Sequence, residues 1–227
     1  GTGDLELVAA GALITGLTGL QSTQFDPLSF TPVVDLGDAT SSGTTEAFRP
    51  EAIDATFPTG IQRVSTFEDD SGQLRQRLLI VPGRFVAQGP DGSNTQELFT
   101  SIATRVFYRD PLVADSSAPF IRESIGRVGD GVVHFEIDVN GDGLAGSDDV
   151  RRVYVLFRPQ DQVVLTDWQG VDLFRVTGTN TWLGGRSFFP FDPGDFEFFV
   201  QAVDVNGNVA TSTAKGTNFR TTEPIES

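Results

Sequence analysis

Apolar and polar residues alternate with a period of two along much of the chain, which is the pattern of β-strands with one buried face. Between residues 133 and 138, valine, phenylalanine and isoleucine alternate with histidine, glutamate and aspartate. Gly, Pro, Asn and Asp interrupt such runs at short intervals, as is typical of an all-β fold. The pattern predicts strands at 75–80, 84–88, 120–128, 132–138, 150–157, 171–176 and 197–203.

Two further segments are expected to be strands on weaker patterns. Residues 98–108 fit a helical spacing at Leu98, Ile102 and Val106, but they also alternate, and their β-branched content favours a strand. Residues 5–20 are apolar but contain Glu6 and fall short of the ~20 apolar residues of a membrane span. We expect them to form one or two strands that pair within the chain. The alternative is that they add to a sheet edge of another copy.

The segment 111–119 begins and ends with proline and has the character of a linker. Apolar periodicity restarts directly after it, so we divide the chain into residues 1–112 and 113–227. The second unit has the ~100-residue size of an immunoglobulin-type sandwich. The sequence therefore predicts two tandem β-sandwich domains.

Residues 138–149 fit an EF-hand-type calcium loop, in which alternate side chains and one carbonyl point at a single ion. Asp138, Asn140 and Asp142 would supply side-chain oxygens, Leu144 its carbonyl and Asp149 the closing carboxylate. A glycine occupies the sixth loop position, where the turn is sharp. The flanking patterns predict strands rather than helices. The alternative is an acidic hairpin turn without metal, but close carboxylates repel one another unless a cation is present.

The amino-acid composition excludes several classes of partner and of catalytic site. The chain carries 16 basic and 31 acidic residues, a net charge of −15, so nucleic acid and anionic membranes are not expected partners. Membrane insertion is not expected either, because the apolar segment 5–20 is too short for a span. It lacks cysteine, which excludes disulfides, thiolate zinc sites and cysteine nucleophiles. His134 is the only histidine, so it alone could serve as the histidine of a Ser-His-Asp triad, and we do not expect one. No spacing among the many carboxylates singles out an acid and a nucleophile, and we expect no enzyme.

The calcium loop resembles those of dockerin modules, which also close with aspartate. Residues 115–121 and 199–210, with an Asp-x-x-x-Pro opening and an Ala-x-Asp-x-x-Gly-Asn hairpin, are similar to bacterial immunoglobulin-like and fibronectin type III-like modules. This resemblance covers residues 113–216. It implies a repeat unit of a secreted, multi-domain surface protein. Asp115 and Asp204 would form a second calcium site only if Asp204 were not already bound by its own turn.

We therefore expect a non-catalytic, extracellular structural or adhesive protein of a bacterial cell surface, stabilised by Ca²⁺. Its partners would be other copies of itself or neighbouring domains of a larger protein. The alternative is a carbohydrate-binding or accessory module of a secreted hydrolase, with Trp168, Trp182 and Tyr154 as a sugar-stacking platform. An exposed tryptophan pair would favour that alternative, and burial of both would favour assembly.

Overall fold

The computed structural model describes residues 7–18, 21–25, 56–57, 60–72, 74–86, 94–110, 112–113, 115–141, 149–159, 167–188, 194–214 and 218–221. Strands are the only regular elements in these ranges, which confirms the all-β class. The first eight are β1 (Val8–Thr18), β2 (Gln21–Phe25), β3 (Thr56–Phe57), β4 (Gln62–Glu68), β5 (Leu74–Ile80), β6 (Gly83–Val86), β7 (Asn94–Leu98) and β8 (Ser101–Arg109).

The remaining strands are β9 (Phe120–Gly129), β10 (Val132–Asn140), β11 (Val150–Pro159), β12 (Gln169–Arg175), β13 (Thr181–Ser187), β14 (Phe196–Asp204), β15 (Val209–Ser212) and β16 (Phe219–Arg220). Each of the seven strands expected from alternation overlaps an observed strand. The ambiguous segment 98–108 is also mainly a strand, β8.

Strands β9 to β16 form an antiparallel β-sandwich. One layer contains β9, β10 and β13, and the other contains β11, β14, β15 and β16, while β12 pairs with β11 along one part and with β13 along another. The core lies between the layers, where the Phe135 ring packs within 5.3–5.5 Å of the rings of Phe157, Phe196 and Phe198. The alternation along β10 accounts for this arrangement, because every second side chain is fully buried.

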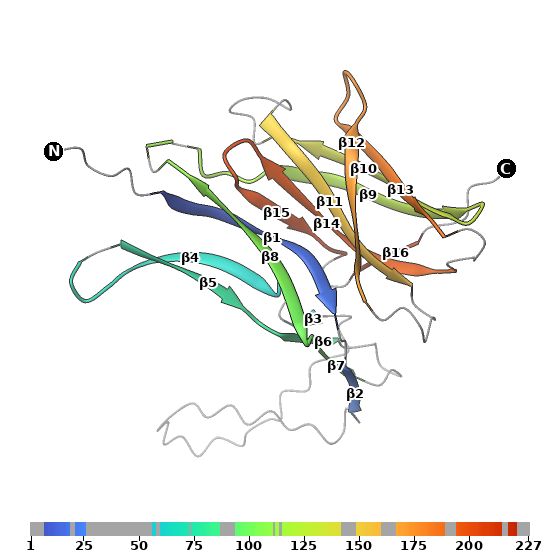
Figure 1. Ribbon diagram of the computed structural model, residues 1–227, viewed down its shortest axis with the longest axis horizontal. Coiled ribbons are helices and arrows are strands. Elements are labelled where there is room, and N and C mark those ends of the chain that lie inside the picture. The colour runs from blue at the N-terminus through green and yellow to red at the C-terminus, as the bar shows by residue number, and fades with distance from the viewer. Residues whose placement is uncertain are drawn as a thin grey trace, which may run out of the picture.

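A third layer covers the outer face of the β11–β14 sheet. β1 pairs with β8 in an antiparallel two-stranded sheet (Figure 1). Leu13, Ile14 and Leu17 of β1 are buried in one apolar cluster with side chains that include Leu156 and Phe199. The β11–β14 sheet is therefore buried on both faces, and β14 reads as a nearly continuous apolar run.

The cluster joins residues on both sides of the expected boundary at residue 113. The other described strands before residue 113 form a four-stranded sheet, β2–β7–β6–β3, and the β4–β5 hairpin. In Figure 1 this hairpin lies beside β1, on the side away from the sandwich. The division into residues 1–112 and 113–227 stays a prediction. No helix long and apolar enough to cross a membrane occurs in the described ranges.

Candidate functional site

The candidate calcium loop connects β10 in one layer of the sandwich to β11 in the other. Asp138 and Asn140 occupy alternate positions at the end of β10, opposite in direction to the buried side chains of Ile137 and Val139. Asp149 directly precedes β11. The structure therefore describes the first, third and last ligand positions of the loop. Asp142 and Leu144 lie outside the described residues.

Asp138 has a carboxylate oxygen that suits a cation. Its Oδ1 atom is buried and accepts no hydrogen bond from the described residues. Its Oδ2 atom lies 3.6 Å from Nη1 of Arg122, a weak and half-exposed ion pair. A buried anionic oxygen without a donor costs free energy unless a positive charge compensates it. Oxygen of this kind is the ligand that calcium prefers.

Asn140 is positioned by the turn between β12 and β13. Its Oδ1 atom accepts a 2.7 Å hydrogen bond from Nδ2 of Asn180, and the amide of Val139 donates to the carbonyl of Asn180 at 3.0 Å. An amide oxygen has two lone pairs, so this contact leaves one for a metal. Asn180 was not singled out from the sequence, because a lone asparagine in a turn carries no distinguishing pattern.

Asp149, at the last ligand position of the loop, is a buried residue. It is only 3% exposed, and its backbone oxygen accepts a 2.8 Å hydrogen bond from the amide of Val205. The end of the loop is thus tied to the β14–β15 hairpin. The donor set of Asp138, Asn140 and Asp149 fits a hard cation. No cluster of three or more His, Cys, Asp or Glu side chains occurs within the described ranges, which omit loop residues 142–148.

Asp204 is engaged by its own turn. Its Oδ1 atom accepts 2.8 Å hydrogen bonds from the amides of Asn206 and Asn208, and its Oδ2 atom accepts one of 2.7 Å from Nδ2 of Asn208. Asp115 enters the same region through Asn206, whose Nδ2 donates to Asp115 Oδ2 at 2.6 Å. These contacts fix the segment before β9 to the last hairpin. They favour the interpretation that Asp204 stabilises its own turn over the one in which it binds a second calcium ion with Asp115.

A buried ionic network, which the sequence did not indicate, joins the two sides of residue 113. Nη2 of Arg158 donates to Glu97 Oε1 at 2.8 Å, and Nε of Arg84 donates to the other Glu97 oxygen. Arg158 also pairs with Glu197. Asn218 bridges Arg84 and Glu197 with hydrogen bonds of 2.9 and 2.6 Å. Two arginines and two glutamates thus balance each other's charge away from water.

The network has a clear effect on the pKa of the Glu97 carboxyl. Burial acts to raise that pKa, but the charges and hydrogen bonds of Arg84 and Arg158 outweigh it and leave the pKa below its usual value. The indole of Trp168 lies under both guanidinium groups, with centroid distances of 5.8 Å to Arg84 and 5.1 Å to Arg158. Charges this well matched indicate a structural role.

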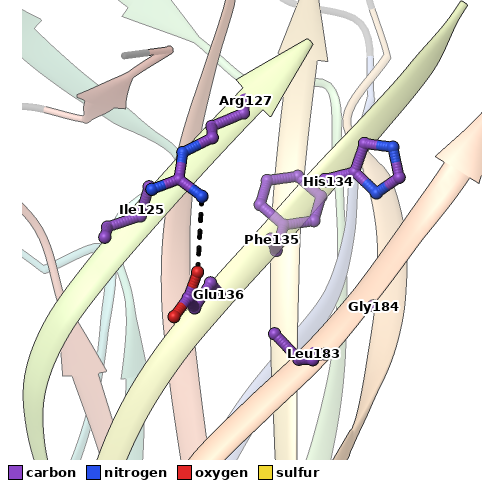
Figure 2. Close-up of a pocket in the computed structure, with 7 residues that line it drawn as sticks. All are labelled: Ile125, Arg127, His134, Phe135, Glu136, Leu183 and Gly184. Atoms are coloured by element: carbon purple, nitrogen blue, oxygen red, sulfur yellow. Dashed lines mark hydrogen bonds and ion pairs between the residues drawn. The ribbon is translucent and has the colours of Figure 1, made fainter. Parts of the chain in front are cut away.

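The two tryptophans are both buried, at 5% for Trp168 and 6% for Trp182, and they belong to different apolar clusters. His134 is exposed on the outer face of β10, beside a shallow groove that Ile125 and Leu183 also line. Figure 2 shows Arg127 and Glu136 meeting in an ion pair there, while the His134 imidazole points away from them. No catalytic arrangement forms around this histidine within the described residues.

A comparison of the chain with models of protein families gives no match, and neither does a comparison with curated proteins.

Proposed function

We propose that this protein is a non-catalytic structural subunit whose β-sandwich is stabilised by calcium in the loop at residues 138–149. The observation that carries the proposal is the buried Oδ1 atom of Asp138, which has no hydrogen-bond donor among the described residues, at the first position of a calcium-type loop. Asn140 and the buried Asp149 add oxygen ligands from the same loop. Asp142 and Leu144 complete the ligand set that the spacing predicts.

The position of the loop gives calcium a mechanical role. The loop leaves β10 in one layer and enters β11 in the other, so a bound ion would hold the ends of both layers together. A cation would also compensate the negative charge of Asp138, whose buried Oδ1 atom has no hydrogen-bond donor among the described residues. Calcium binding would therefore appear as conformational stability rather than as catalysis.

The arrangement of strands supports an immunoglobulin-like identity for the second unit. β9, β10 and β13 are neighbours in that order, as are β11, β14 and β15, which matches the A-B-E and C-F-G orders of an immunoglobulin-type sandwich, while β12 pairs with both β11 and β13. Modules of this type serve as repeated units of extracellular surface proteins. We propose the same setting for this chain, with a β-sandwich-like unit at residues 1–112 and with other copies or adjacent domains as partners.

The carbohydrate-binding alternative loses its main support. A sugar-stacking platform needs exposed aromatic faces, and both tryptophans are buried. Tyr154 is also buried, and its hydroxyl donates to the backbone oxygen of Thr15 at 3.1 Å. We therefore favour assembly or surface attachment over sugar binding.

Thermal unfolding of the full chain in calcium and in chelator tests the proposal. Calcium at about ten times its Kd should add about 1.4 kcal/mol to the free energy of unfolding. The variant Asp138→Asn should lose most of this gain. Asp130→Asn is the matched control, because it removes one charge from the opposite end of β10, at a turn position with φ of 53° that asparagine tolerates. An identical unfolding temperature in calcium and chelator would refute the proposal.

A further inference from the structure

Four of the chain's fifteen arginines surround one pocket at the edge of the sandwich. The pocket lies where β8 passes the start of β11 and the end of β12, and its charged lining residues are Arg105, Arg151, Arg152, Arg175 and Asp172. The lining thus carries four positive charges and one negative charge. In a molecule with a net charge of −15, this concentration of positive charge is unusual.

Two of these arginines already have partners within the chain. Arg152 forms a two-pronged ion pair with Asp172, and its guanidinium lies 4.6 Å from the centroid of the Tyr154 ring. The Asp172 carboxylate holds the pKa of Arg152 above its usual value, against the opposing effect of partial burial. Nε of Arg175 donates to the carbonyl of Thr179 at 2.8 Å. These contacts fix one wall of the pocket.

The other two arginines, Arg105 and Arg151, are exposed and form no ion pair with a carboxylate in the described parts of the chain. Trp182 also lines the pocket, and its indole Nε1 is buried without an acceptor among the described residues. The polar groups of the lining that lack partners are thus donors. Such a site suits a ligand that brings acceptors and negative charge.

We infer that this pocket binds an oxyanion, a carboxylate or sulfate group, with Arg105 and Arg151 as its charge partners. Planar guanidinium groups match the geometry of both anions, because each presents paired N–H donors to paired oxygens. Phe107 and Leu173 supply an apolar wall for the group that carries the anion. The inference goes beyond the proposed calcium function and does not depend on it. The oxyanion can come from a small molecule or from carboxylates of a second copy of this acidic chain.

The test uses the ¹⁵N-labelled full chain titrated with sodium sulfate, and with sodium chloride at equal ionic strength. The chain has two tryptophans and therefore two indole N–H resonances, and that of Trp182 reports on the pocket. Sulfate should shift the Trp182 resonance in a saturable manner, whereas chloride should not. The Arg105→Gln/Arg151→Gln variant should bind sulfate at least about tenfold more weakly, since it loses two charged hydrogen-bonding partners.

Arg63→Gln/Arg186→Gln is the matched control. It removes two exposed charges from other strands, and sulfate binding should be unchanged. Sedimentation velocity then separates the two sources of the anion. If the protein self-associates, and both sulfate and the Arg105→Gln/Arg151→Gln variant suppress this, the oxyanion comes from a second copy. If the protein is a monomer that binds sulfate saturably, the oxyanion comes from a small molecule. A shift that does not saturate, or equal affinities in the two double variants, would overturn the inference.

Discussion

The side chain of Gln201 forms two hydrogen bonds with the backbone of Ile14. Its Oε1 atom accepts from the Ile14 amide and its Nε2 atom donates to the Ile14 carbonyl, both at 2.8 Å. Gln201 is fully buried at the centre of β14. Its side-chain amide satisfies both backbone groups of Ile14 on β1, as a neighbouring strand would. The pair thereby attaches the third layer to the sandwich through polar contacts inside an apolar cluster.

Replacing Gln201 with leucine should destabilise the protein by about 2–6 kcal/mol. Leucine keeps much of the volume but leaves the buried amide and carbonyl of Ile14 without partners, at about 1–3 kcal/mol for each unsatisfied group. Urea unfolding, followed by circular dichroism, measures the change. Gln76→Leu is the control, because Gln76 forms the same kind of paired contact with the backbone of Ala9 but in an exposed position. Similar losses in the two variants would contradict the role of burial.

Gly11 of β1 should tolerate alanine poorly. An added Cβ would lie 2.7 Å from the backbone oxygen of Gly207 and 2.8 Å from the amide nitrogen of Val209, so β1 would have to move away from the last hairpin. Overpacking of this kind costs about 1–3 kcal/mol. Gly16 lies at the other bulge of β1, and a Cβ there meets only the Cβ of Ala103 at 3.7 Å. Gly16→Ala should therefore be nearly neutral in thermal unfolding, and equal effects at the two glycines would refute the close approach.

Glu97→Gln should cost about 3 kcal/mol, since it leaves two buried guanidinium groups without the carboxylate they share. The pKa of Glu97 is lower in the folded than in the unfolded protein, so the folded state binds the proton more weakly. Its stabilisation is therefore fully present above the ordinary glutamate pKa of about 4.3 and is lost as the pH falls below it.

Urea unfolding between about pH 6 and pH 3 checks this dependence. On acidification, the free energy of unfolding should fall less in the Glu97→Gln variant than in the natural chain. Glu136→Gln is the control, since Glu136 pairs with Arg127 on the surface and should contribute less than about 1 kcal/mol. The same pH dependence in the natural chain and in Glu97→Gln would contradict the assignment.

A fragment of residues 113–227 tests the division of the chain. If the sandwich is an independent unit, the fragment folds in calcium and shows the β-sheet circular dichroism of the full chain. Without β1 and β8 it should expose Leu156 and Phe199, which are at most 5% exposed in the full chain. We therefore expect it to bind a hydrophobic dye that the full chain does not bind. An unfolded fragment would mean that the two halves share one core.

Alternation predicted strands well where one face meets the core and the other meets water. β10 is the clearest case, since buried residues alternate without a break with residues that are half-buried or exposed. The same reasoning missed β13, where Gly184 and Gly185 replace apolar residues. A Cβ at Gly184 would lie 2.5 Å from the Leu173 side chain, and one at Gly185 would lie 2.5 Å from the Val133 carbonyl. Glycine appears there because neighbouring strands approach closely, and a single sequence does not reveal such contacts.

The sequence located the candidate calcium loop because its ligands are close together in the chain. The ionic network around Glu97 escaped prediction because its members are far apart, with 61 positions between Arg158 and Glu97 and 134 between Arg84 and Asn218. The Gln201–Ile14 contact escaped for the same reason. Local spacing identifies a site made by one loop, whereas a site assembled by tertiary packing leaves no local signal.

The distance of 187 positions between Ile14 and Gln201 has a consequence for biosynthesis. At about 5–20 residues per second, a ribosome needs on the order of 10–40 seconds to add Gln201 after Ile14. During that time β1, an apolar segment, can pair with β8 but has no β14 to cover it. The nascent chain is therefore expected to depend on chaperones that shield β1 until the sandwich has emerged.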